Sequence, residues 1–150
     1  MSSKSLMVIA HPDDEAIFGG YLLEQPDDWV VLCVTNGYKP HRSSEFYKSM
    51  EIAGAQGVIW EFLDKLGVPL DAQVSEMLKD FIEAGDYDRF VTHGEDGETD
   101  HIHHKQIHAW MKKIVGNKLE TFDLSKRKLT PMAQAYRSQQ QLYQLLIPML

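Results

Sequence analysis

The chain has 150 residues, of which 43% are apolar and 25% charged, and its formal net charge is -7. These values are close to those of ordinary globular proteins, and the length predicts one domain, residues 1–150, with a hydrophobic core. The lysines and arginines do not gather into one stripe, which argues against nucleic-acid binding along a phosphate backbone and against an anionic membrane surface as a partner.

A single cysteine, Cys33, excludes a disulfide within the chain and favours a reducing, cytoplasmic environment. Cys33 lies in an apolar run and is predicted to be a buried strand residue. No stretch is long and apolar enough to predict a membrane span. The apolar run near the N-terminus is too short for a signal peptide.

Five apolar runs predict five β-strands. These runs are continuous rather than alternating in polarity, as is typical of strands that are buried on both faces of a sheet. In chain order they cover residues 5–10, 29–35, 58–63, 87–92 and 119–124. The last of them is the weakest.

Helical periodicity lies between and after the strands. Helices are expected over residues 16–23, 42–55, 71–84, 100–115 and 131–146, with Asp100 capping the fourth. The alternation predicts an α/β fold of three layers, Rossmann-like, with a mainly parallel sheet of about five strands between helices. The fingerprint Gly-x-Gly-x-x-Gly is absent from the first turn, so a dinucleotide cofactor is not expected.

The turn between the first strand and the first helix reads Ala10-His11-Pro12-Asp13-Asp14-Glu15. One imidazole and three carboxylates therefore lie at the carboxyl end of a strand, where open α/β sheets bind ligands. Asp13 or Asp14 can cap the following helix, but capping needs only one carboxylate. The density of such groups predicts half of a metal site.

Four histidines fall within eight positions: His101, His103, His104 and His108. In a helix, His101, His104 and His108 share one face, and His103 is expected to point elsewhere. His104 would then lie near a strand's carboxyl end, as the turn at residues 10–15 does. A catalytic zinc takes about three nitrogen and oxygen ligands and one open position, which one histidine from each turn and a carboxylate can supply. Taken alone, the histidines are equally compatible with a solvated or capping cluster.

These motifs resemble the PIG-L/LmbE-type zinc N-acetylglucosaminyl deacetylases. Residues 10–15 match that family's Ala-His-Pro-Asp-Asp-Glu without a mismatch. Residues 92–104 are similar to its Thr-His-Gly-x-x-Gly segment followed by Gly-His-Pro-Asp-His. Weaker similarities lie at residues 35–37, 42–45 and 136–139, so the resemblance runs from end to end.

The resemblance implies an LmbE-like fold and a zinc-dependent hydrolase that removes the N-acetyl group from an N-acetylated amino sugar or small glycoconjugate. It implies that His11, Asp14 and His104 bind zinc, or another divalent metal. Asp13 would be the general base that takes a proton from the activated water, and His101 would stabilise the oxyanion or protonate the leaving amine. Arg42 is either a contact for a substrate hydroxyl or an ordinary helix-surface partner of Glu45.

The chain departs from the family pattern in two ways. His103 replaces the aspartate of His-x-Asp-His and Ile102 replaces its proline, with Asp100 as a candidate substitute for the aspartate. The chain is also shorter than is usual for the family, which predicts a shallower, more open sugar site. Two alternatives therefore stay open: a catalytically impaired metal-binding module of the same fold, or a metal-dependent amidase or esterase for another small substrate.

The other polar residues receive ordinary structural interpretations. Asp64 is expected to be a turn residue and His93 a hydrogen-bonded strand-end residue, while His41 and His108 are not expected to be ligands. Residues 138–139 are expected to pack against the first turn. The apolar residues 145–150 are compatible with a sheet-edge contact or a homo-oligomer interface.

Overall fold

The computed structural model describes residues 4–136. The later part of the helix expected over residues 131–146, the pair at 138–139 and the apolar residues 145–150 lie outside this range. No helix within residues 4–136 has both the length and the apolar character needed to cross a membrane.

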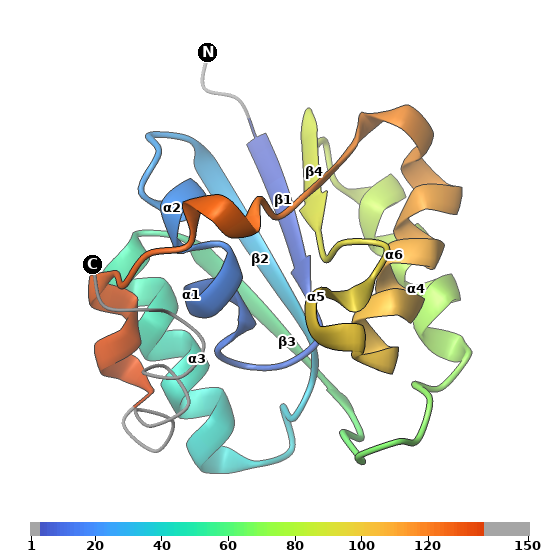
Figure 1. The fold of residues 1–150 in the computed structure, drawn as a ribbon, viewed down its shortest axis with the longest axis horizontal. Coiled ribbons are helices and arrows are strands. Elements are labelled where there is room, and N and C mark those ends of the chain that lie inside the picture. The colour runs from blue at the N-terminus through green and yellow to red at the C-terminus, as the bar shows by residue number, and fades with distance from the viewer. Residues whose placement is uncertain (1–3, 137–150) are drawn as a thin grey trace.

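Five parallel strands form one sheet in the order β3-β2-β1-β4-β5 (Figure 1). The strands are β1 (Lys4–Ile9), β2 (Asp28–Thr35), β3 (Gln56–Phe62), β4 (Arg89–Thr92) and β5 (Leu119–Thr121). β1 lies at the centre, with Leu6 in register with Val30 of β2 on one side and Phe90 of β4 on the other. The predicted α/β fold with a parallel sheet of five strands is confirmed.

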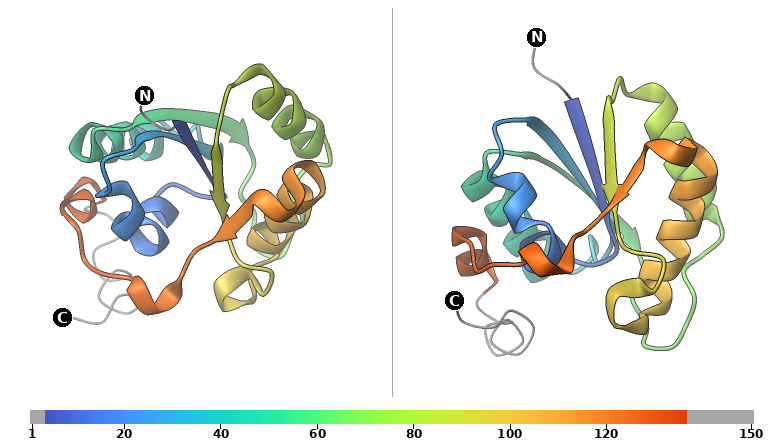
Figure 2. Two further views of the ribbon diagram at one scale, coloured as in Figure 1. Left: turned by 90° about the horizontal axis from the view of Figure 1, so that it is seen from above. Right: turned by 45° about the horizontal axis from the view of Figure 1, so that its top comes forward.

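Helices cover both faces of the sheet, as the two further views show (Figure 2). One face carries α1 (Asp14–Phe18), α2 (Gly20–Leu23), α3 (Pro40–Ala53) and the 3-10 turn η3 (Pro131–Ala135). The other face carries α4 (Gln73–Ala84) and α6 (Ile102–Val115). The short elements α5 (Gly97–Asp100), η1 (Gly116–Lys118) and η2 (Leu124–Lys126) lie in the connections.

The core has two parts because successive residues of each strand point to opposite faces. In β1, Met7 and Ile9 pack with α1, α2 and α3, whereas Leu6 and Val8 pack with α4 and α6. All four side chains are fully buried. Burial on both faces explains why the strands read as continuous apolar runs.

The expected helix over residues 16–23 is divided into α1 and α2 at Gly19. A Cβ atom at Gly19 would lie 2.7 Å from Met7 Cε, so the helices approach β1 closely here and a larger residue would force the Met7 side chain to shift. The fifth strand is shorter than predicted and ends at Thr121. The loop expected over residues 94–99 contains the single turn α5.

The strand order reverses between β1 and β4, and the region between the carboxyl ends of these two strands is called the crevice below. From β1 the chain proceeds outward to β2 and β3, and it then returns to the other side of β1 to form β4 and β5. The connections that follow β1 and β4 therefore diverge to opposite faces of the sheet. In open α/β sheets, ligands bind at such a switch point.

Candidate metal centre

The turn after β1 brings two carboxylates close to His11 without using either as a helix cap. Asp13 occupies the cap position of α1 with φ 93°, and its side chain makes no capping hydrogen bond. Asp14 instead folds back, so that its Oδ2 accepts a hydrogen bond from the His11 backbone N–H at 2.9 Å. The capping role that the sequence allows for Asp13 or Asp14 is thus not used, which leaves the metal interpretation of the turn in place.

Glu15 supports this turn from the core. Its Oε1 accepts a hydrogen bond from the Asp13 N–H at 3.0 Å, and its Oε2 accepts one from the hydroxyl of Tyr136. Glu15 is fully buried, and burial raises its pKa to about 7. The third carboxylate of the turn therefore holds the backbone conformation rather than facing the crevice.

The histidine cluster begins one residue before α6. His101 is the cap residue of α6, and its Nδ1 accepts a hydrogen bond from the His103 N–H at 3.2 Å. Asp100 does not cap the helix, contrary to the expectation, because it has φ 64° and its exposed side chain pairs with Lys105. Asp100 therefore does not replace the carboxylate that the family places beside the histidines.

His103 lies in the site, and the expectation that it points elsewhere is wrong. It is fully buried, its Nδ1 lies 2.9 Å from His11 Nε2, and its Nε2 donates to the Val68 carbonyl at 2.6 Å. The helical spacing used in the prediction does not apply across His101, because that residue has an extended backbone with ψ 123°. His103 and His104 are consecutive in the first turn of α6, and both rings reach the turn after β1.

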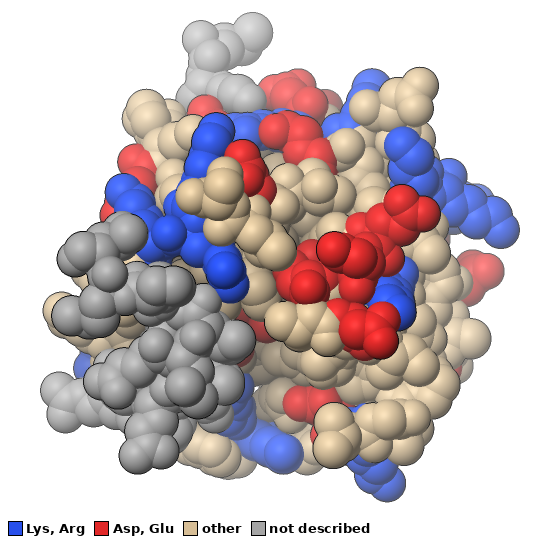
Figure 3. Space-filling view, viewed as in Figure 1, with Lys and Arg blue, Asp and Glu red and all other residues tan. Residues whose placement is uncertain are grey.

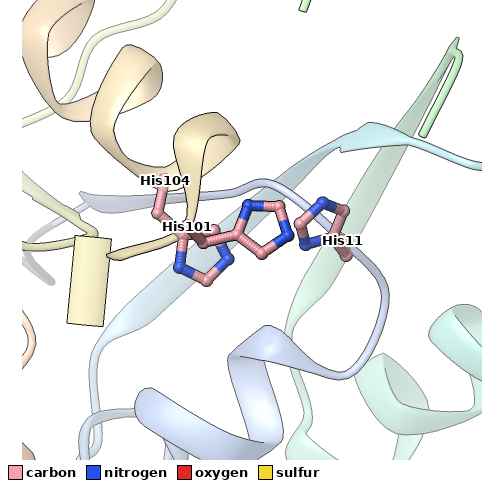
Figure 4. Close-up of side chains that lie close together, drawn as sticks. All are labelled: His11, His101 and His104. Carbon is pink, nitrogen blue, oxygen red and sulfur yellow. The ribbon is translucent and has the colours of Figure 1, made fainter. Parts of the chain in front are cut away.

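Asp14 is the centre of the predicted ligand set. Its Oδ2 lies 3.3 Å from His11 Nδ1 and 3.3 Å from His104 Nε2. Ligand atoms about 2.0–2.1 Å from a tetrahedral zinc ion are about 3.3–3.4 Å apart, so both spacings are those of neighbouring ligands. The rings of His11, His101 and His104 gather at this point from the two sides of the crevice (Figure 4).

The hydrogen bonds assign a tautomer to each neutral histidine of the cluster. His101 accepts at Nδ1, so its proton is on Nε2. His103 donates from Nε2 to a carbonyl, so its Nδ1 is the acceptor for the N–H at His11 Nε2. The lone pair of His11 is then on Nδ1, which faces Asp14.

Glu98 of α5 fixes the tautomer of His104. Its Oε1 lies 3.0 Å from His104 Nδ1 and 2.6 Å from His93 Nδ1, so both rings donate to one carboxylate. His104 Nε2 is left as a lone pair, and it is buried without a hydrogen bond from any residue in the described range. A buried, unpartnered imidazole nitrogen beside a carboxylate is a donor set that fits a metal ion.

His93 has neither nitrogen available. Its Nδ1 donates to Glu98, and its Nε2 accepts a hydrogen bond from the Ala10 N–H at 3.1 Å. His108 Nδ1 bonds the His93 carbonyl at 2.9 Å, away from the ligand atoms. His93 is thus a hydrogen-bonded residue at the end of β4, as its sequence position indicates.

The electrostatics of the site favour a positive charge. Burial alone would lower the pKa of His11 and of His104, but the Asp14 carboxylate raises them to about 10 and about 9. Burial would raise the pKa of Asp14, yet His104 and His11 hold it well below its usual range. Because the carboxylate stabilises protons on both rings, a divalent cation can replace those protons at the same place.

Asp64 also lies in the site, although its position after β3 suggests only a turn residue. Its Oδ1 lies 3.4 Å from His11 Nε2 and 3.6 Å from His103 Nδ1, and its Oδ2 accepts a hydrogen bond from Asn36 at 3.3 Å. The hydrogen bond with His11 holds the pKa of Asp64 below its usual range. His11, Asp64 and His103 could hold a metal as a set, but the 2.9 Å between the two ring nitrogens is a hydrogen-bond distance.

Asp13 of the turn lies beside Arg42 of α3. Arg42 Nη2 donates to the Pro12 carbonyl at 2.7 Å and lies 3.8 Å from Asp13 Oδ2, while Nη1 donates to Glu45 at 3.1 Å. Arg42 therefore pairs with Glu45, as one of its two sequence interpretations has it, and in addition joins α3 to the turn. Burial and the neighbouring Asp14 raise the pKa of Asp13 well above its usual range, although Arg42 opposes the shift.

Sequence reasoning missed three members of the site: His103, Asp64 and Glu98. A sequence signal existed for Asp64, which follows the carboxyl end of β3, and for His103, which belongs to the histidine cluster. Glu98 had no such signal, because it is one of four acidic residues between positions 95 and 100 of a polar loop. Only the fold selects it among these carboxylates.

The fold and the site define an α/β protein that has a His/Asp cluster able to hold a metal ion at the switch point of its sheet. Residues 6–115 match the family model described as PIG-L, GlcNAc-PI de-N-acetylase, and the chain belongs to this family. Family membership supports an enzyme of the deacetylase type, a hydrolase of the LmbE kind.

Similar proteins include one relative by sequence and two by structure. An uncharacterised protein of Acanthamoeba polyphaga mimivirus is 31% identical over 158 residues, which cover 93% of this chain and 70% of that protein. The 4-carboxy-2-hydroxymuconate hydratase GalB of Pseudomonas putida superposes with a TM-score of 0.74 at 16% identity, covering 95% of this chain and 82% of that one. The N,N'-diacetylchitobiose deacetylase of Pyrococcus horikoshii gives 0.59 at 17% identity, covering 78% and 52%. At these identities the two structures show a shared fold.

Proposed function

We propose that the protein is a zinc-dependent hydrolase that removes the N-acetyl group from an N-acetylated amino sugar or small glycoconjugate. One observation carries the proposal. Asp14 Oδ2 lies 3.3 Å from His11 Nδ1 and from His104 Nε2. His104 Nε2 is buried without a hydrogen bond from the described residues, and the hydrogen bonds of His103 leave the lone pair of His11 on Nδ1. His11, Asp14 and His104 are therefore the proposed ligands of zinc or another divalent metal.

When bound, such an ion lowers the pKa of a water molecule and polarises an amide carbonyl. The protein's own part begins with Asp13. Its carboxylate faces Arg42, whereas the carboxylate of Asp14 faces the histidines, and this difference supports separate roles for the two neighbours. We propose Asp13 as the general base that accepts a proton from the attacking water.

His101 is proposed to stabilise the oxyanion as a neutral hydrogen-bond donor. Its Nδ1 is occupied by the His103 N–H, so the single proton of the neutral ring is on Nε2. An imidazolium could not accept that hydrogen bond, and a nearby dication further disfavours a second positive charge. The structure thus favours oxyanion stabilisation over protonation of the leaving amine, the two roles that the family resemblance leaves open.

Arg42 is proposed to orient the turn and to reach a substrate hydroxyl. A guanidinium has five N–H donors, and hydrogen bonds to Pro12 and Glu45 occupy two of them. The side chain is only 11% exposed. A substrate must therefore enter close to the turn after β1 to contact it.

The surface near the crevice favours a neutral substrate. Figure 3 shows acidic side chains gathered over α5 and the loop before it, where Glu95, Asp96 and Asp100 are exposed. Together with the net charge of -7, this patch repels anionic groups and favours the ammonium group that deacetylation creates. A neutral N-acetylated sugar is consistent with that field.

The test is acetate release from N-acetylglucosamine derivatives by the zinc-loaded protein. Asp13→Asn is the matched control, because it keeps the shape of the side chain and removes its ability to accept a proton. We expect activity in the wild type, and zinc binding without activity in the variant. Equal activity in both proteins would remove Asp13 as the base.

A metal-binding module without catalysis is the second candidate, and the replacement of the family aspartate by His103 favours it. Zinc binding without turnover on a broad set of N-acetylated compounds would support this candidate. Turnover of other amides or esters alone would instead support the amidase or esterase alternative.

A further inference from the structure

We propose that His103 is a positioning residue that holds His11 in the tautomer and orientation required for metal binding. This inference rests on the proposed function, because it assumes that His11 is a ligand. It assigns a specific task to the residue that stands where the family has an aspartate.

A chain of hydrogen bonds carries the inference. The Val68 carbonyl accepts the N–H of His103 Nε2 at 2.6 Å, and His103 Nδ1 accepts the N–H of His11 Nε2 at 2.9 Å. Val68 belongs to the loop between β3 and α4, so its backbone carbonyl fixes the first tautomer independently of the metal site. The second tautomer follows from the first, since His103 can then only accept at Nδ1.

The consequence reaches the proposed ligand atom. With the proton on Nε2, His11 presents the lone pair of Nδ1, the nitrogen that lies 3.3 Å from Asp14 Oδ2. Ligating histidines donate their other ring N–H to a carboxylate, a backbone carbonyl or water. In this chain the acceptor for His11 is the neutral imidazole of His103, and the acceptor for His104 is the carboxylate of Glu98.

His103 is placed for this task rather than for direct ligation. Its ring is fully buried, and its Nε2 is committed to the Val68 carbonyl. Its Nδ1 lies 2.9 Å from His11 Nε2, closer than the spacing of about 3.3 Å for two ligand atoms of one tetrahedral zinc ion. Asp64 lies 3.4 Å from the same His11 nitrogen and provides a second, more distant acceptor.

Three possible roles of His103 predict different outcomes for two substitutions. His103→Leu keeps an apolar volume but removes the acceptor. His103→Asn keeps an acceptor, because the amide Oδ1 is bonded to Cγ as the ring Nδ1 is, but an amide is a poor zinc ligand. A positioning role predicts that Leu weakens zinc binding and Asn largely retains it. A packing role predicts that Leu is tolerated and Asn is not, and a ligand role predicts that both fail.

The experiment measures the zinc dissociation constant of each full-length protein by competition with a chelating dye, alongside thermal unfolding of the metal-free forms. We expect His103→Leu to bind zinc about 10-fold more weakly than the wild type, at the lower end of the range for such partners because Asp64 remains. We expect His103→Asn to bind nearly as tightly as the wild type. Should the Leu variant not fold, loss of binding in a folded Asn variant still overturns the proposal.

The outcomes separate the inference from the function on which it rests. A wild-type protein that binds no zinc contradicts the proposed function. A wild type that binds zinc, with a His103→Leu variant that binds it equally tightly, contradicts only the positioning role of His103.

Discussion

Replacing Glu98 with alanine tests how His93 and His104 are held in place. The side chain is 2% exposed, and its Oε1 lies 2.6 Å from His93 Nδ1 and 3.0 Å from His104 Nδ1. Both histidines are buried, so the substitution leaves two ring N–H groups without their acceptor. The histidines hold the pKa of Glu98 at about 2, against the effect of its burial, so the group that is lost is a carboxylate.

The magnitude follows from those two contacts. A buried donor left without a partner costs about 1–3 kcal/mol, so Glu98→Ala should lower the free energy of unfolding of the metal-free protein by about 2–6 kcal/mol. Because His104 loses the partner that orients it, zinc affinity should fall by about 10–100-fold. Glu98→Gln keeps an acceptor oxygen and should lose less in both measurements.

The assays are urea unfolding of the metal-free protein and zinc titration against a chelating dye. Glu95→Ala is the matched control, since Glu95 is exposed in the same loop and its loss should change stability by no more than about 0.5 kcal/mol. A Glu98→Ala protein that binds zinc as tightly as the wild type would refute the reasoning that Glu98 orients His104.

Three further outcomes are expected. Asp13→Asn should raise the free energy of unfolding in urea unfolding, because it removes a buried carboxylate whose charged form is disfavoured beside Asp14; a less stable variant would contradict this. Cys33 should not react with a thiol reagent until the protein is unfolded, since burial raises its pKa and it is fully enclosed; rapid labelling of the native protein would show otherwise. When free zinc is present at 100 times its dissociation constant, removing it with a chelator should lower the free energy of unfolding by about 2.7 kcal/mol. An unfolding curve that the chelator leaves unchanged would argue against zinc binding to the folded state.

The fold could be predicted because its information is local. β1 and β2 are buried on both faces, so their uninterrupted apolar runs mark them within one residue of their observed ends. The break at Gly19 was not predicted, because a single glycine is tolerated within a helix. The close approach of Gly19 to Met7 of β1 depends on how the helices pack on the sheet.

The candidate site was only partly predictable. The motif at residues 10–15 and the histidine cluster identified the two connections that meet, because these connections follow the carboxyl ends of two neighbouring strands, β1 and β4. The predicted orientation of His103 was wrong because this orientation depends on where α6 begins, and the ends of helices are poorly marked by periodicity. Glu98 is selected by its φ of 61° and its contacts with two histidines, neither of which is encoded in its neighbours.

A crystal structure of the zinc-loaded protein, with anomalous scattering measured at the zinc edge, tests the central claim most directly. We predict one zinc ion bound by His11 Nδ1, Asp14 Oδ2 and His104 Nε2, at about 2.0–2.2 Å from each atom. A zinc ion bound instead by His11, Asp64 and His103, or no ion between the two connections, would contradict the claim.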